Sequence, residues 1–163
     1  MMATRLQRPC KVALFVGGTR WHGHALREAG FRSYLREFAP EIVPLDTSVN
    51  LETRQLTYEA TLDLLNRVPD LAGLYVAGGG MEGAIAAVRK LRPPDRIALI
   101  VNELTPESRQ SLADRYLTMV IATPLEELCA ALVNNMVHQL MQGKLQTVRV
   151  APFAPQIWLP ESV

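Results

Sequence analysis

Three glycines in the stretch LYVAGGGMEGAIAAV have the spacing of a phosphate-binding turn. Gly78, Gly80 and Gly83 follow the pattern G-x-G-x-x-G between a short apolar run and a helix-like segment. Such a turn holds a dinucleotide on the N–H groups at the start of a helix. Asn102 and Glu103 then stand about where an acidic residue would bind the ribose of the cofactor. One hypothesis for this loop is therefore a Rossmann-type NAD(P) site.

The place of the loop along the chain favours a different hypothesis. A dinucleotide turn normally follows the first strand of its domain, whereas two strand-and-helix units precede Gly78. Glycine also permits a sharp turn from strand to helix, or a close approach to a neighbour or a small ligand. The N–H groups at a helix start can donate to hydroxyl oxygens as well as to phosphate. The glycines thus indicate the edge of a ligand site, and NAD(P) binding remains the alternative.

Neither a catalytic nor a metal-binding constellation is predicted. His22 and His24 form a His-x-His pair, but the sequence places no third ligand beside them and His138 lies far along the chain. The serines lack the surroundings of a nucleophile elbow, and no reactive-cysteine motif surrounds Cys10 or Cys129. We therefore expect a binding protein without catalysis, metal or cofactor.

Charge and composition narrow the range of partners. The 163 residues include 17 basic and 16 acidic side chains, a formal net charge of +1, which gives no long-range attraction for nucleic acid or anionic lipid. The apolar run at 12–16 is too short for a signal-peptide core, and no uncharged stretch is long enough to span a bilayer. The two cysteines fit reduced thiols. These features predict one cytoplasmic domain over residues 1–163.

Short apolar runs alternate with amphipathic segments along the chain, which predicts an α/β fold. Helices are expected over 24–38 and 51–68, and also from Pro106 and Pro124, each of which follows a threonine that can cap a helix. The expected strands lie at 12–16, 42–45, 74–77, 97–101 and 119–122, with terminal strands at 147–151 and 156–159. This order predicts a three-layer sandwich with a doubly wound, mainly parallel sheet.

Unusual loops follow three of the predicted strands, at 17–24, 78–82 and 102–105. In open α/β sheets the ligand crevice lies outside the carboxyl ends of the strands. Arg27 and Glu103 would then face one crevice with opposite charges. Either residue alone would be interpreted as a solvated surface charge. Because three loops converge, we predict a small-molecule site at this edge of the sheet.

The segment 124–142 predicts a helix whose apolar face is wider than one contact with a sheet requires. Its apolar residues are Leu125, Leu128, Cys129, Leu132, Val133, Met136, Val137, Leu140 and Met141. A deeply buried helix would explain this composition. A second body that covers the face would explain it equally well.

The segment Arg27-Glu28-Ala29-Gly30-Phe31 resembles the R-x-x-G-F element of the lactose-repressor (LacI) family of transcriptional regulators and the related type I periplasmic sugar-binding proteins. The resemblance extends over residues 11–162, through segments that follow in the family's order at 69–74, 76–83, 97–105, 118–123 and 156–162. It implies the second lobe of a two-lobed effector-binding core, with the fold of a type I periplasmic binding protein lobe.

The resemblance also implies a function. The chain would correspond to the later part of such a regulator, so that the DNA-binding headpiece and most of the first lobe lie outside it. The helix at 124–142 would pack on that first lobe. The expected function is to bind a sugar-like or polyol effector, as a homodimer that reaches DNA only through the headpiece and does not contact membranes. A stand-alone half-domain that associates with itself is the other alternative.

Site residues can be carried over from the family one by one. Arg27 matches its ligand-contacting arginine, and Glu103 matches the acid that accepts hydrogen bonds from ligand hydroxyls, for which a guanidinium fork and a carboxylate are well suited. Many members have an Asn-Asp pair where this chain has Gly79 and Gly80, which leaves backbone groups in that place. Trp21 could stack on a sugar ring. The predicted ligand-binding residues are Arg27, Glu103, Trp21, Asn102, Gly80, Met81 and Glu82.

Overall fold

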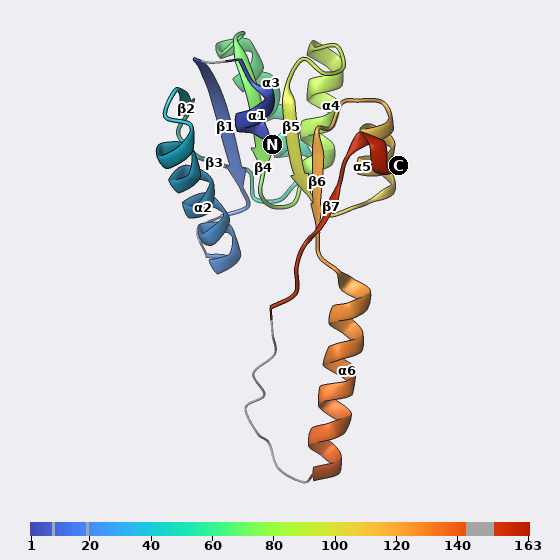
Figure 1. Ribbon diagram of the computed structural model, residues 1–163. Helices are drawn as coiled ribbons and strands as arrows, with labels where there is room; N and C mark the ends of the chain where they lie inside the picture. Colours follow the sequence, from blue (N-terminus) through green and yellow to red (C-terminus); the bar gives the residue numbers. More distant parts are fainter. Residues whose placement is uncertain (8, 19, 143–151) are drawn as a thin grey trace.

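A computed structural model describes residues 1–7, 9–18, 20–142 and 152–163, and Figure 1 shows the arrangement of its elements. In chain order these are α1 (Met2–Arg5), β1 (Cys10–Val16), α2 (His22–Phe38), β2 (Ile42–Pro44), β3 (Ser48–Val49), α3 (Arg54–Arg67), β4 (Leu71–Val76), α4 (Met81–Leu91), β5 (Ala98–Asn102), α5 (Pro106–Ala113), β6 (Met119–Ala122), α6 (Leu125–Gln142), β7 (Gln156–Trp158) and a 3-10 helix (Pro160–Ser162). The strand predicted at 147–151 lies outside the described residues.

The described strands form one mostly parallel sheet of order β2-β1-β4-β5-β6-β7, with β3 also paired to β1. Among these described strands, the pair of β6 with β7 is antiparallel and the other pairs are parallel. The chain leaves β1 toward β2 on one side and returns to β4 on the other. The order of the strands therefore reverses at β1, where ligands bind in doubly wound sheets. The predicted α/β class and parallel sheet are confirmed.

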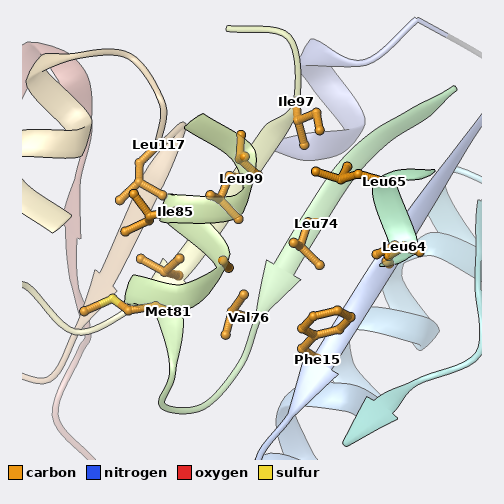
Figure 2. Close-up of a cluster of buried hydrophobic side chains, with 14 of the residues drawn as sticks. Phe15, Leu64, Leu65, Leu74, Val76, Met81, Ile85, Ile97, Leu99 and Leu117 are labelled. Carbon is orange, nitrogen blue, oxygen red and sulfur yellow. The ribbon is translucent and has the colours of Figure 1, made fainter. Parts of the chain in front are cut away.

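Helices cover both faces of the sheet because alternate residues of each strand point to opposite sides. From β1, Val12 and Leu14 pack with residues of α1 and α2. Phe15 points to the other side, toward a larger cluster from α3, α4 and α5. Figure 2 shows part of this second cluster, with Phe15 and Leu74 from the sheet facing Leu64 and Ile85 from the helices. The buried runs read from the sequence are thus the core of a three-layer sandwich.

Threonine caps fix the starts of two helices near the carboxyl edge of the sheet. The predicted cap at Thr105 is confirmed: its side chain accepts a hydrogen bond from Ser108 N, and the Ser108 hydroxyl accepts one from Thr105 N. The helix predicted over 51–68 begins later, at Arg54, because Thr53 caps it and Glu52 has a left-handed backbone (φ 57°). The turn before α3 therefore belongs to the loops of the site edge.

The helix α6 extends away from the body of the molecule, at the end of a neck formed by β6 and the segment that leads into β7 (Figure 1). None of its residues is buried. Its large apolar side chains are exposed: Leu125, Leu128, Leu132, Val133, Met136, Val137, Leu140 and Met141. The wide apolar face is therefore uncovered among the described residues. Within the same described part of the chain, no helix combines the length and apolar character that crossing a membrane requires.

Candidate ligand-binding site

Two hollows lie at the carboxyl edge of the sheet, and Arg27, Asn102 and Glu103 line both. The glycine-loop hollow has a volume of about 340 Å³ and is completed by His24, Glu52, Gly78, Gly79, Gly80, Met81, Glu82 and Thr105. The neck hollow has a volume of about 470 Å³ and is completed by Tyr75, Ile121, Ala122, Thr123, Pro124, Leu128, Phe153 and Pro155. The loops after β4 and β5 thus meet at this edge as predicted, whereas the predicted loop 17–24 contributes only His24, which lies in the first turn of α2.

Arg27 reaches this edge from α2. Its Nη1 donates a hydrogen bond of 2.6 Å to the carbonyl oxygen of Ala77, directly after β4. This bond holds the guanidinium across the carboxyl end of the strand. A guanidinium has five N–H donors in a planar fork. One hydrogen bond to the backbone therefore anchors the group and leaves other N–H donors available. Arg27 is therefore positioned to bind oxygen atoms in either hollow.

Glu103 follows β5 with a left-handed backbone (φ 71°). Its Oε1 accepts a hydrogen bond of 2.7 Å from the Thr123 hydroxyl, and its Oε2 accepts one of 3.1 Å from Thr123 N. The Thr123 hydroxyl, predicted to cap α6, thus donates to Glu103. Among the described residues Arg27 and Glu103 form no ion pair with each other, because each is held by a different neighbour. Each carboxylate oxygen can still accept a second hydrogen bond.

Asn102 lies beneath these charged groups and is only 6% exposed. Its Oδ1 accepts a hydrogen bond of 3.0 Å from the Tyr75 hydroxyl, and its Nδ2 donates to Ile121 O at 3.4 Å. Burial raises the pKa of Tyr75, while the charge of Arg27 and the bond to Asn102 act in the opposite direction. The phenol therefore keeps its proton and acts as the donor. Asn102 mainly joins three strands at the floor of the site.

Close contacts explain the three glycines of the G-x-G-x-x-G pattern. A Cβ at Gly80, whose φ is +82°, would lie 2.2 Å from Thr57 Oγ1, and a Cβ at Gly83 would lie 2.1 Å from Arg54 O. At Gly78 a Cβ would lie 2.9 Å from the Cε1 atom of His24. Such distances are too short for any side chain, so these positions need glycine for packing. The structure favours the steric hypothesis over an NAD(P) site.

Trp21 lies apart from the other predicted site residues. It precedes α2, its side chain is exposed, and it lines neither hollow. Its ring lies beside His24, with 6.5 Å between the ring centroids. The other six predicted residues, Arg27, Asn102, Glu103, Gly80, Met81 and Glu82, all line the glycine-loop hollow. Their role in ligand binding stays a prediction.

Sequence reasoning missed Glu52 and its neighbours. Glu52 Oε1 accepts a hydrogen bond of 3.1 Å from Gly79 N and lies 3.3 Å from His24 Nε2. The buried side chain of Asn50 donates to Gly79 O at 2.9 Å and accepts a bond from Glu52 N. Gly79 is thus held through both its N–H and its carbonyl group. Only the polar N-x-E triplet before Thr53 could have indicated this turn, and the apolar pattern assigned it to the helix.

The described residues contain no group of three or more His, Cys, Asp or Glu side chains that could hold a metal ion. The site instead combines anchored charged groups with backbone turns. Residues 1–145 match the family model described as a periplasmic binding protein domain. The chain belongs to this family. The match covers most of the sequence and includes every residue that lines the glycine-loop hollow, whereas Phe153 and Pro155 of the neck hollow follow it.

Solved structures of periplasmic and sugar-binding proteins share the fold of the chain. GanP, a glucose-galactose binding protein from Geobacillus stearothermophilus, is 19% identical with a TM-score of 0.82, over 94% of this chain and 54% of its own. A periplasmic solute binding protein of an ABC transporter from Actinobacillus succinogenes, with bound D-allose, is 16% identical with a TM-score of 0.85, over 98% of this chain and 56% of its own.

A periplasmic sugar-binding protein from Pseudomonas fluorescens is 26% identical with a TM-score of 0.74, over 87% of this chain and 43% of its own. The chain therefore spans about half the length of these similar structures. No protein of curated function matches the sequence. The comparisons confirm the type I periplasmic binding protein fold, which is the structural part of the resemblance found in the sequence.

Proposed function

We propose that this periplasmic binding protein lobe binds a sugar or polyol at the carboxyl edge of its sheet. The observation that carries the proposal is that Arg27, Asn102 and Glu103, from two different segments, line the same two hollows. An anchored guanidinium and a carboxylate suit the adjacent hydroxyl groups of a sugar. The names of similar structures, a glucose-galactose binding protein and a protein with bound D-allose, support this ligand class.

The mode of action follows from the shape of the molecule. We infer that the chain acts as the second lobe of a two-lobed receptor, in which α6 packs its exposed apolar face on a first lobe. A ligand held between two lobes favours the closed arrangement through contacts that the open one lacks. The function is then binding and closure, without a catalytic step. The neck hollow, lined by Thr123 and Pro124 at the base of α6, lies where the lobes would meet.

We further propose, from the Arg27–Phe31 element, that the parent protein is a LacI-type regulator in which a sugar effector alters DNA binding through a headpiece. Translation of the source DNA upstream of the Met1 codon tests this role. A helix-turn-helix and a first lobe in frame would support it. A secretory signal segment in frame would instead assign the lobe to a transport receptor, without changing the proposed ligand class.

Binding of sugars to single variants tests the proposed site. We expect Arg27→Ala and Glu103→Gln each to weaken binding by about 10- to 100-fold, because each removes charge-assisted hydrogen bonds of about 1.5–3 kcal/mol. The measurement is calorimetric titration with D-glucose, D-galactose, D-allose and D-ribose. Arg36→Ala is the matched control, since this arginine lies on the same helix but lines neither hollow. Unchanged affinity in both site variants would refute the assignment.

A further inference from the structure

Glu52 adds a second supported carboxylate to the glycine-loop hollow. It comes from the turn between β3 and α3, with a left-handed backbone at both Leu51 and Glu52. One oxygen, Oε1, accepts from Gly79 N and faces His24 Nε2. The other oxygen, Oε2, has no hydrogen bond or ion pair within the described part of the chain, and 39% of the side chain is exposed. Glu52 therefore presents a free oxygen from a fixed position.

The surrounding backbone leaves room for this carboxylate and for its imidazole partner. A Cβ at Gly17 would lie 2.2 Å from Glu52 Cγ and 2.8 Å from His24 Cε1, and one at Gly78 would lie 3.0 Å from Glu52 Oε1. The loops that follow β1 and β4 thus have glycine at the positions where the pair packs. His24 is more than nine-tenths buried, and its Nδ1 has no hydrogen-bond partner among the described residues. The pair occupies a fitted space at the floor of the hollow.

The lining of the glycine-loop hollow carries more negative than positive charge. Three carboxylates, Glu52, Glu82 and Glu103, face it with one arginine, Arg27. Protonation of His24 would add one cation, so carboxylates outnumber cations in either state of the imidazole. Thr123 donates to Glu103 through neutral groups, which leaves the charge of that carboxylate in place. Closing such a hollow over an uncharged ligand would strip water from unpaired carboxylates, at a cost in free energy.

We propose that Glu52 is a specificity-determining residue that makes this hollow prefer a sugar or polyol with a protonated amine over its neutral counterpart. An ammonium group offers three donors and a positive charge. It would donate to the free Oε2 of Glu52 while ligand hydroxyl groups bind Arg27 and Glu103. This inference rests on the proposed sugar-binding function and adds a charge requirement to it.

The test compares three ligands that share one sugar ring: D-galactosamine, its neutral N-acetyl form and D-galactose. Titrations are made at a pH of about 6.5, below the usual pKa of an amine of this kind, about 7.7–8. We expect D-galactosamine to bind about 10-fold more tightly than the two neutral sugars, and added salt to reduce this preference. Glu52→Gln should remove the preference while it keeps an oxygen that can accept from Gly79 N. Glu59→Gln, an exposed carboxylate outside both hollows, should retain it.

Each outcome separates this inference from the function on which it rests. If D-galactose binds as tightly as D-galactosamine, or if Glu52→Gln retains the preference, the role of Glu52 is refuted and sugar binding stands. If none of these three sugars nor the sugars of the earlier titration binds, the proposed function fails and the inference fails with it. Amide spectra of Gly79 in Glu52→Gln show whether the loop keeps its place, so that loss of preference is distinguished from loss of the turn.

Discussion

Single polar side chains join segments that lie far apart in the sequence. Glu103 and Thr123 connect the end of β5 to the base of α6, and Asn50 and Glu52 hold Gly79 from both sides. Each of these contacts saturates a backbone or hydroxyl group near the site edge. Ligand groups must therefore bind beside existing hydrogen bonds, and the remaining lone pairs set where they can do so.

Another polar group of this kind makes a pH-dependent contribution to stability. A hydrogen bond from the Thr47 hydroxyl lowers the pKa of Glu28. Burial acts in the opposite direction, and the hydrogen bond and charge of Arg32 lower the pKa further. A carboxyl group with a lowered pKa stabilises the fold above its usual pKa of about 4.3, and this contribution is lost as pH falls through the lowered value. We therefore expect Thr47→Val to reduce the free energy of unfolding by about 0.5–1 kcal/mol at neutral pH.

Urea unfolding at neutral pH and again at a pH of about 3 measures this effect. The difference between wild type and Thr47→Val should shrink as the pH is lowered, because protonation of Glu28 removes the charge that the hydroxyl group stabilises. An equal difference at both pH values would show that the hydroxyl acts through packing alone. Thr4→Val, at a threonine whose hydroxyl donates only to a backbone carbonyl near the amino terminus, is the control and should show no such pH dependence.

At the scale of the element, two glycines inside helices should affect stability in opposite directions when each is replaced by alanine. Gly83 lies in α4 where this helix contacts α3, and a Cβ there would meet Arg54 O at 2.1 Å. Gly30 lies in α2, and a Cβ there would have no atom within 4 Å. We expect Gly83→Ala to destabilise the fold by about 2–3 kcal/mol through overpacking. Gly30→Ala should stabilise it by up to about 1 kcal/mol, because alanine favours helix.

Thermal and urea unfolding of the two alanine variants measure both effects under the same conditions. Because the substitution and the secondary structure are the same, only the space around each Cβ differs. If both variants changed stability in the same direction, packing between α3 and α4 would not be the reason for Gly83. The pair thus tests the steric account of the G-x-G-x-x-G pattern.

Elements with strong local signals were predictable, and the contacts between them were only partly so. Apolar runs predict the parallel strands, and Thr105 followed by Pro106 predicts the start of α5. The turn at Glu52 was not found, because its role depends on Gly79 and His24, which lie far away in the sequence. The position of Trp21 was not predictable either, because no pattern in the sequence indicates the direction in which an exposed side chain beside a helix start points. The two-residue strand β3 is too short for any periodicity.

At the scale of the whole molecule, the exposed helix α6 is the main apolar surface that the described residues leave uncovered. An apolar face of this length normally contacts another body. We expect the chain by itself to associate through α6, so that light scattering gives a mass above the 18.1 kDa of one chain. The double variant Leu132→Lys, Met136→Lys should shift the mass toward one chain, while Asn134→Lys on the same helix should not. A wild-type monomer at high concentration would contradict this role of α6.

We propose that the carboxyl edge of the sheet binds a sugar. Amide chemical shifts of the isotope-labelled chain, followed during titration with D-galactose and D-galactosamine, test it most directly, because they report even weak binding residue by residue. We predict saturable shifts at Gly78–Gly80 and Asn102–Thr105, with the face formed by α5 unchanged. Titration of both sugars to high concentration without saturable shifts, or with shifts confined to residues away from the two hollows, would refute sugar binding at this edge.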